Sequence, residues 1–179
     1  MKAIVYHSPN DIRYETDYPE PQLKGLNDVK LKVHFCGICG SNLHEYKDGP
    51  TFFAKKGERH AISNKEYPHV MGHEMSAEVV EIGSEVKDIK IGDSVVVEVT
   101  GTCYDRERFE DSPTAGADKC GACADGYYNA CKYLGLTGLG LSDGGLAEYV
   151  VTDANKIVKF DNSKIPYDVA ALIQPLAVA

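Results

Sequence analysis

The 179-residue sequence has no cluster of basic residues, because its 19 lysines and arginines are scattered among 27 aspartates and glutamates. Proteins that bind nucleic acid or anionic membranes usually concentrate positive charge on one surface, so neither partner is expected. Long apolar runs are also missing. The longest, residues 169–179, is interrupted by Gln174-Pro175, whereas a membrane-spanning helix needs about 20 apolar residues.

A secretory signal is missing as well, since charged residues and prolines occupy the first twenty positions where an apolar core would be needed. We therefore expect a reducing compartment, the cytoplasm, in which the six cysteines bind metal and do not form disulfides. The alternative is a secreted domain with three disulfides, which free thiols and bound metal would exclude. The length fits one domain, which can bury roughly 70% of its unfolded surface.

Helical periodicity is scarce, and short strands separated by turn residues dominate the pattern. The clearest strand is 29–35, in which four apolar residues alternate with polar ones, as in a strand with one buried face. Further strands are predicted at 2–6, 11–15, 75–82, 92–98, 146–152 and 156–160. Helix is expected only near Ser41 and from Pro166 onward. This distribution favours a small antiparallel β-barrel.

Two short motifs contain the residue types of a catalytic metal site. Cys39, His73 and Glu74 offer a thiolate, an imidazole and a carboxylate, a mixture that suits zinc, and three protein ligands are typical of a catalytic zinc. Ser41 and His44 follow Cys39 by two and five residues. On a short helix the hydroxyl would lie near the metal and the imidazole one turn further out, which suggests a proton path.

The same stretch has a second interpretation, in which Cys36-x-x-Cys39 is a structural pair and the histidines are unrelated to it. The long polar loop that follows, residues 46–68, is expected to form a rim over the site, because loops of this length are usually functional or disordered. His60 and His69 are expected at the surface and not among the ligands.

A second metal site is indicated by three cysteines with the spacing Cys-x2-Cys-x7-Cys: Cys120, Cys123 and Cys131. A structural zinc requires four ligands and a closed shell. Cys103 is the preferred fourth ligand, because the charged insertion 104–119 can form a loop at modest entropic cost. Cys36 is the rival candidate, and Cys103 could instead be a small buried apolar residue.

The glycine-rich segment 135–145 superficially resembles a nucleotide-binding loop. The dinucleotide fingerprint requires Gly-x-Gly-x-x-Gly between a strand and a helix, but here Asp143 occupies the position of the third glycine and a strand follows. We therefore predict a turn, and the sequence indicates no cofactor-binding residues.

Taken together, these motifs resemble the zinc-dependent medium-chain alcohol dehydrogenase family, and within it the fungal 2,3-butanediol dehydrogenase branch. The resemblance covers the whole chain and rests on Cys36–Ser41, Leu43–Tyr46, Asp48–Pro50, Gly72–Glu74, Gly92–Val95, the four cysteines and Gln174–Val178. It implies a mainly β fold, a GroES-like, partly open antiparallel β-barrel with few short helices over residues 1–165. Residues 166–179 would begin a helix that leads to a Rossmann domain outside this chain.

The resemblance also implies roles for single residues. Cys39 and His73 would bind a catalytic zinc, Glu74 would be an adjacent or exchangeable ligand, and Ser41 and His44 would relay the proton. The structural zinc would be held by Cys103, Cys120, Cys123 and Cys131. Two positions depart from the commonest family pattern: Asn42 stands where most relatives carry aspartate, and Gln174 stands where polyol-type members carry glutamate. Gln174 would be a further ligand of the catalytic zinc.

The implied function is that of a zinc-dependent dehydrogenase that oxidises secondary alcohols or vicinal diols, such as 2,3-butanediol, to acetoin-like products. NAD or NADP would accept the hydride, and the full-length protein would be a homo-oligomer. We expect this fragment alone to be inactive, because none of its residues can accept a hydride. The alternative from another class is a non-catalytic zinc-binding module with a structural or assembly role.

Overall fold

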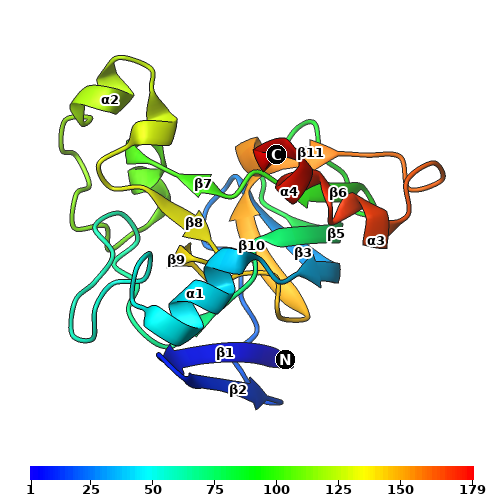
Figure 1. Cartoon of the computed structure of the whole chain (residues 1–179). Helices are drawn as coiled ribbons and strands as arrows, with labels where there is room; N and C mark the ends of the chain where they lie inside the picture. Colours follow the sequence, from blue (N-terminus) through cyan, green and yellow to red (C-terminus); the bar gives the residue numbers. More distant parts are fainter.

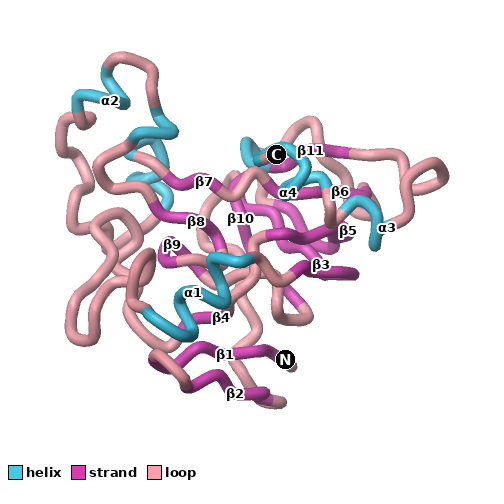
Figure 2. Tube along the Cα trace, viewed as in Figure 1, coloured by secondary structure: helices cyan, strands magenta, loops and turns pink.

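The computed structural model describes all 179 residues as three small β-sheets with short helices at their edges (Figure 1). The strands are β1 (Ala3–Ser8), β2 (Asp11–Glu15), β3 (Asp28–Gly37), β4 (His69–Val70), β5 (Glu74–Ile82), β6 (Ser94–Val97), β7 (Thr100–Gly101), β8 (Gly135–Thr137), β9 (Gly140–Ser142), β10 (Tyr149–Asp153) and β11 (Ile157–Lys159). The helices are α1 (Gly40–Asp48), α2 (Gly121–Ala124), α3 (Tyr167–Ala170) and α4 (Ile173–Val178), with 3-10 turns η1 (Cys103–Arg108), η2 (Tyr128–Ala130) and η3 (Ala154–Lys156). Strands and loops account for most of the trace (Figure 2).

The central sheet has five strands in the order β10-β3-β5-β6-β11, and every neighbouring pair is antiparallel. It curls around the main apolar core, to which β3 contributes Val29 and Leu31, both fully buried. Two three-stranded sheets, β2-β1-β4 and β7-β8-β9, lie beside it (Figure 1). The predicted mainly β, partly open barrel is therefore confirmed, and the 179 residues contain no Rossmann-type parallel sheet.

The predicted alternation of β3 holds from Leu31 to His34 but is wrong at Lys30 and Phe35. Lys30 is buried and its Nζ lies 2.5 Å from Glu20 Oε1, whereas Phe35 is half exposed. The pairing of β3 with β5 shifts register at two places, between Lys30 and Leu31 and between Val33 and Phe35. Such irregularities redirect side chains, and a simple period of two cannot anticipate them.

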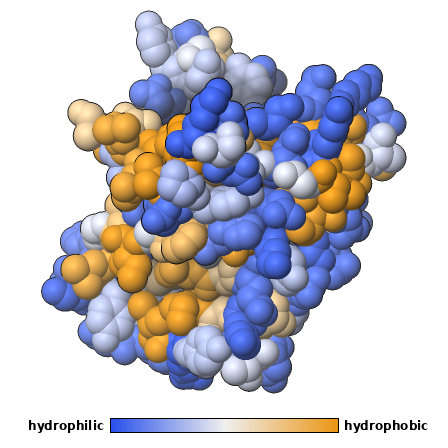
Figure 3. Space-filling view, turned by 90° about the vertical axis from the view of Figure 1, so that its right-hand side faces the viewer, coloured by the Kyte–Doolittle hydropathy of each residue, from blue (hydrophilic) through white to orange (hydrophobic).

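The C-terminal segment forms two short helices in place of the one that the sequence predicts. Pro166 immediately precedes α3, and α4 lies against β5 and β6. Both helices leave apolar side chains exposed, among them Leu176 and Val178, and apolar patches lie among polar side chains on this face of the molecule (Figure 3). None of the helices has the length and apolar character that a membrane crossing requires.

The surface positions predicted for His60 and His69 are wrong, because both side chains are buried. His69 lies 4.6 Å from Phe53 between ring centroids, and Phe53 stacks on Tyr6 at 4.9 Å. The polar loop between α1 and β4 therefore folds over a second, aromatic core instead of forming an open rim. His60 satisfies its Nδ1 atom by accepting two backbone hydrogen bonds, from residues 62 and 63.

Burial gives His69 a measurable effect on stability. Desolvation, with a smaller contribution from Lys65, lowers the pKa of His69 to about 3. An unfolded chain takes up this proton near the ordinary pKa of about 6.5, so protonation favours unfolding as the pH falls from about 6.5 toward 3. We expect His69→Phe, which keeps an aromatic ring in the cluster, to lose less unfolding free energy over this pH range than the unmodified protein does. Urea unfolding of both proteins across this pH range tests it, and equal pH dependence would contradict it.

Candidate metal centres

The first candidate centre forms where β3 ends and β5 begins. Antiparallel pairing sets Gly37 opposite Glu74, and the chain then turns through Cys39 into α1. The potential ligand atoms of Cys39, His73 and Glu74 all lie within 4.8 Å of one another. Ligands of a tetrahedral zinc lie about 3.3 to 3.8 Å apart, from bond lengths of 2.0 to 2.3 Å. The structure thus brings all three predicted residues together at a spacing that small side-chain movements can adapt to zinc.

Two glycines flank Cys39, and only one of them, Gly37, lies in a crowded position. A Cβ atom on Gly37 would overlap the Glu74 carboxylate, with Glu74 Cβ only 3.1 Å away. A Cβ atom on Gly40 would meet nothing within 4 Å. Gly37 therefore allows the carboxylate to approach the β3 backbone, and Gly40 has no comparable role.

His73 is buried in a form suited to metal binding. Desolvation lowers the pKa of His73, although Glu74 partly opposes this shift, so the imidazole is neutral, as a ligand must be. Its Nε2 atom lies 3.5 Å from Ser41 Oγ, and its Nδ1 atom is buried without a hydrogen-bond partner. Metal-binding histidines usually donate their second N–H to a carboxylate or carbonyl, and His73 has no such acceptor.

Helix α1 carries Ser41 and His44, the two residues predicted to relay the proton, but only Ser41 lies near the candidate ligands. Ser41 lies against the cluster through its contact with His73, whereas His44 is more than half exposed, with Nδ1 3.2 Å from Asp48 Oδ2. No hydrogen bond joins Ser41 to His44. Between them, Asn42 is buried, accepts from the Cys39 N–H at 3.1 Å through Oδ1, and leaves Nδ2 without a partner.

Gln174 lies on α4, which contacts both β5 and β6. Its Oε1 atom is buried and has no hydrogen-bond partner. Gln174 also lines a cleft of about 480 Å³, whose other walls are mostly apolar and include Val96 and Leu136. An unpaired amide oxygen is suited to a ligand, and the role of Gln174 at the catalytic metal stays a prediction.

The second candidate centre is a cluster of four cysteines in a lobe that extends from the barrel at β7 and β8 (Figure 1). Cys131 Sγ lies 3.6 Å from Cys103 Sγ and 3.9 Å from Cys120 Sγ, and a zinc tetrahedron requires sulfur atoms about 3.8 Å apart. Cys123 completes the group. The structure brings in Cys103 and leaves Cys36 outside, and all six cysteines are free thiols.

Backbone N–H groups already point at these sulfur atoms. Cys120 Sγ accepts from Lys132 N at 3.5 Å, and Cys131 Sγ accepts from Tyr133 N at 3.4 Å. The hydrogen bond from Lys132 is the largest cause that lowers the pKa of Cys120 to about 6. Since the thiolate is the form that binds metal, the backbone of the lobe prepares this ligand.

The sequence did not reveal how the lobe is attached to the barrel. Residues 104–119, predicted as a loop, begin with the 3-10 turn η1, whose charged side chains point in different directions. Asp105 Oδ1 lies 3.1 Å from Lys156 Nζ, and Arg108 Nε lies 3.4 Å from Asp28 Oδ1. Arg106 stays within the lobe and donates to the carbonyls of residues 117 and 118 at 2.7 and 2.9 Å.

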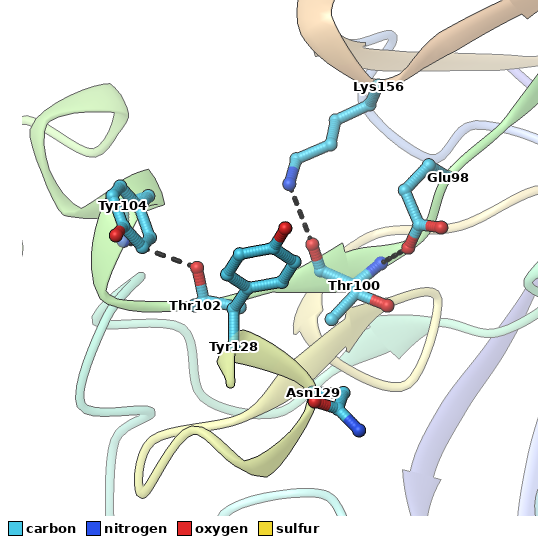
Figure 4. A pocket seen from close by; sticks show the side chains of 7 residues that line it. All are labelled: Glu98, Thr100, Thr102, Tyr104, Tyr128, Asn129 and Lys156. Carbon is cyan, nitrogen blue, oxygen red and sulfur yellow. Dashed lines mark hydrogen bonds between the residues drawn. The ribbon is translucent and has the colours of Figure 1, made fainter. Parts of the chain in front are cut away.

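A polar pocket of about 450 Å³ lies between the barrel and the lobe (Figure 4). Lys156 Nζ donates to the Thr100 carbonyl at 2.8 Å, and Glu98 accepts from the Thr100 N–H at 2.8 Å. The Tyr128 ring lies between the two ends of the pocket in this view. None of the predicted catalytic residues lines this pocket.

Comparison with known proteins decides the family. The sequence profile of the alcohol dehydrogenase GroES-like domain matches residues 25–162. The chain belongs to this family. The GroES-like domain is 48% identical over 178 residues to a probable (R)-acetoin-forming diacetyl reductase of Saccharomyces cerevisiae and 43% identical to the (R,R)-butanediol dehydrogenase of the same yeast. The predicted membership of the zinc-dependent medium-chain alcohol dehydrogenases, in their butanediol dehydrogenase branch, is confirmed.

The GroES-like domain accounts for less than half of these relatives. The two matches cover 99% of this chain but 42% and 46% of the yeast proteins. The crystal structure of 2R,3R-butanediol dehydrogenase from Bacillus subtilis superposes with a TM-score of 0.81 at 38% identity, covering 99% of this chain and 45% of that one. The fold of the GroES-like domain is therefore shared with a larger enzyme.

The four-cysteine cluster makes a prediction that separates the rival ligands. We expect Cys103→Ala to weaken metal binding in the lobe, because one missing thiolate opens the closed shell, while Cys39 and His73 stay in place. Cys36→Ala, the matched control, should retain the lobe metal. Zinc counted per chain after dialysis against a weak chelator distinguishes the variants, and the reverse pattern would show that the fourth ligand is misassigned.

Proposed function

We propose that this chain is the catalytic domain of a zinc-dependent dehydrogenase that oxidises secondary alcohols or vicinal diols with NAD or NADP. The observation that carries the proposal is the meeting of Cys39, His73 and Glu74 at the end of β3. The yeast and bacterial relatives named above, two butanediol dehydrogenases and a probable acetoin-forming diacetyl reductase, support a vicinal diol as the substrate. The rest of the full-length protein would supply the nicotinamide.

Cys39, His73 and Glu74 would hold the catalytic zinc, with Gln174 as a further ligand. When bound, the zinc supplies Lewis-acid polarisation of the substrate oxygen. Ser41, whose Oγ lies 3.5 Å from His73 Nε2, would take the hydroxyl proton of the alcohol. The nicotinamide of the full-length protein would supply the hydride acceptor, so that the carbon bearing this hydroxyl group, after loss of one proton and one hydride, would become a carbonyl.

His44 would pass the proton to solvent, since its side chain is exposed. Because no hydrogen bond joins Ser41 to His44, a water molecule would bridge them. Cys103, Cys120, Cys123 and Cys131 would hold the structural zinc in the lobe. The apolar side chains left exposed on α3 and α4 would pack against the remainder of the full-length protein, which would be a homo-oligomer.

The full-length protein tests this proposal. We expect it to reduce NAD or NADP in the presence of 2,3-butanediol, and the 179-residue chain alone to be inactive. Ser41→Ala should lower kcat by roughly 10² to 10⁴-fold, the usual contribution of a proton-transfer group, without loss of zinc. Ser84→Ala, an exposed serine away from both clusters, is the control. A zinc-containing protein that oxidises no alcohol would instead favour a structural or assembly module.

The two amides make a further prediction. Asn42→Asp together with Gln174→Glu would replace two neutral amides by carboxylates and so add negative charge around the proposed metal site. We expect the double variant in the full-length protein to bind catalytic zinc about 10-fold tighter, the lower end of effects from outer-shell groups. It should also raise the pKa seen in the pH-rate profile, since added negative charge disfavours deprotonation. Chelator competition measures the affinity. Lower stability with unchanged zinc affinity would show that the amides do not act on the metal.

A further inference from the structure

The glycine-rich segment that lacks the nucleotide-binding spacing has another role in the fold. Residues 138–146 lie along residues 70–72, the backbone that leads directly into His73 and Glu74. Four backbone hydrogen bonds join the two segments: Gly72 N to Gly138 O (3.1 Å), Gly144 N to Val70 O (2.9 Å), Gly145 N to Gly72 O (2.8 Å) and Leu146 N to Met71 O (2.9 Å). Residues 71–73 belong to no strand, so these bonds replace the ladder that would otherwise hold them.

The contact between the two segments leaves no room for side chains. A Cβ atom on Gly144 would overlap the Gly72 carbonyl and lie 2.9 Å from the Met71 carbonyl. Gly72 itself has a φ of +97°, and a Cβ there would lie 2.6 Å from Cys36 Sγ. Because the obstacles to Gly144 are backbone atoms, an added methyl group cannot be accommodated by a side-chain rotation.

Asp143, which occupies the position of the third glycine, binds the same backbone through its side-chain carboxylate. Its Oδ1 accepts from Val70 N at 2.9 Å, and its Oδ2 accepts from Lys65 Nζ at 2.9 Å and from Tyr18 OH at 3.3 Å. The Asp143 carboxylate therefore joins Val70 to the neighbouring Lys65 and to the distant Tyr18.

We propose that the 138–145 segment is the positioning element of the catalytic metal site, with Gly144 and Asp143 as positioning residues for His73 and Glu74. This inference rests on the proposed function, in which His73 and Glu74 bind metal. Functional groups must be held to within about 0.5 Å, and residues that support them determine whether they are. The hydrogen bonds to residues 70–72 supply that support, because these residues directly precede His73 in the sequence.

Gly144→Ala in the full-length protein is the direct test, with Gly40→Ala as the matched control. Gly40 lies next to Cys39, yet an added Cβ there meets nothing within 4 Å. We expect Gly144→Ala to weaken zinc binding at the catalytic site by about 10 to 100-fold and to leave the zinc of the four-cysteine site in place. Gly40→Ala should bind both ions as the unmodified protein does. Equal catalytic-site affinity in all three proteins would overturn the proposal.

Asp143 provides a second test that does not depend on a crowded glycine. Asp143→Asn keeps an oxygen acceptor for the Val70 N–H, whereas Asp143→Ala removes it. We expect Asp143→Ala to lower catalytic-site affinity by about 10-fold and Asp143→Asn to restore most of it. Cobalt placed at the catalytic site should show an altered visible spectrum in Asp143→Ala alone, because the spectrum reports the arrangement of the ligands. Unchanged affinity and spectrum in Asp143→Ala would overturn the proposal, even if Gly144→Ala fails to fold.

The zinc content of the unmodified protein separates this inference from the proposed function. One zinc per chain, bound only by the four cysteines, would refute the catalytic metal site and with it both ideas. Two zinc ions per chain that persist equally in Gly144→Ala and Asp143→Ala would leave the proposed function standing and refute the positioning role alone.

Discussion

The antiparallel pairing of β3 with β5 is the constraint on which the candidate catalytic site depends. It sets Gly37 opposite Glu74, so the end of one strand and the start of the other meet at the same edge of the sheet. Cys39 follows the first strand and His73 precedes the second, and the ligand atoms converge although more than thirty residues separate them in the sequence. The buried valines and leucine of this sheet thus stabilise the arrangement of the polar site.

The lobe is stabilised in a different way from the barrel, because its own apolar core is small. Three buried cysteines form the centre of that core, and the connection to the barrel is made by charged side chains. The pair of Asp105 with Lys156 and that of Arg108 with Asp28 are largely buried, and breaking one partner of such a pair leaves a costly buried charge. The two candidate metal centres therefore share a chain but no ligands, and each has its own support.

Much of this structure could be predicted from the sequence where a local pattern decides the outcome. Seven of the eleven strands follow from alternation and turn residues, but β4, β7, β8 and β9 were not predicted, and β8 and β9 occupy the segment 135–145 that was predicted as a turn. Both candidate ligand sets contain short motifs, Gly72-His73-Glu74 and Cys-x2-Cys-x7-Cys, whose residue types indicated metal binding. The errors arose where distant contacts decide. Lys30 and Phe35 depend on register shifts against β5, and His69 is buried because an aromatic cluster forms around it. The ion pairs of η1 join residues up to 80 positions apart, which no local pattern indicates.

The burial of Cys36 has a consequence for the chemical reactivity of the domain. Desolvation raises the pKa of this thiol to about 12, so at neutral pH it carries almost no thiolate, the form that attacks electrophiles. Its Sγ lies close to the backbone at Gly72 and Gly145, where no added atom fits. Cys36 is thus a poor nucleophile although it lies three residues from Cys39. The two cysteines of one Cys-x-x-Cys motif therefore differ in chemistry: Cys36 is a thiol of low reactivity, and Cys39 is a candidate metal ligand.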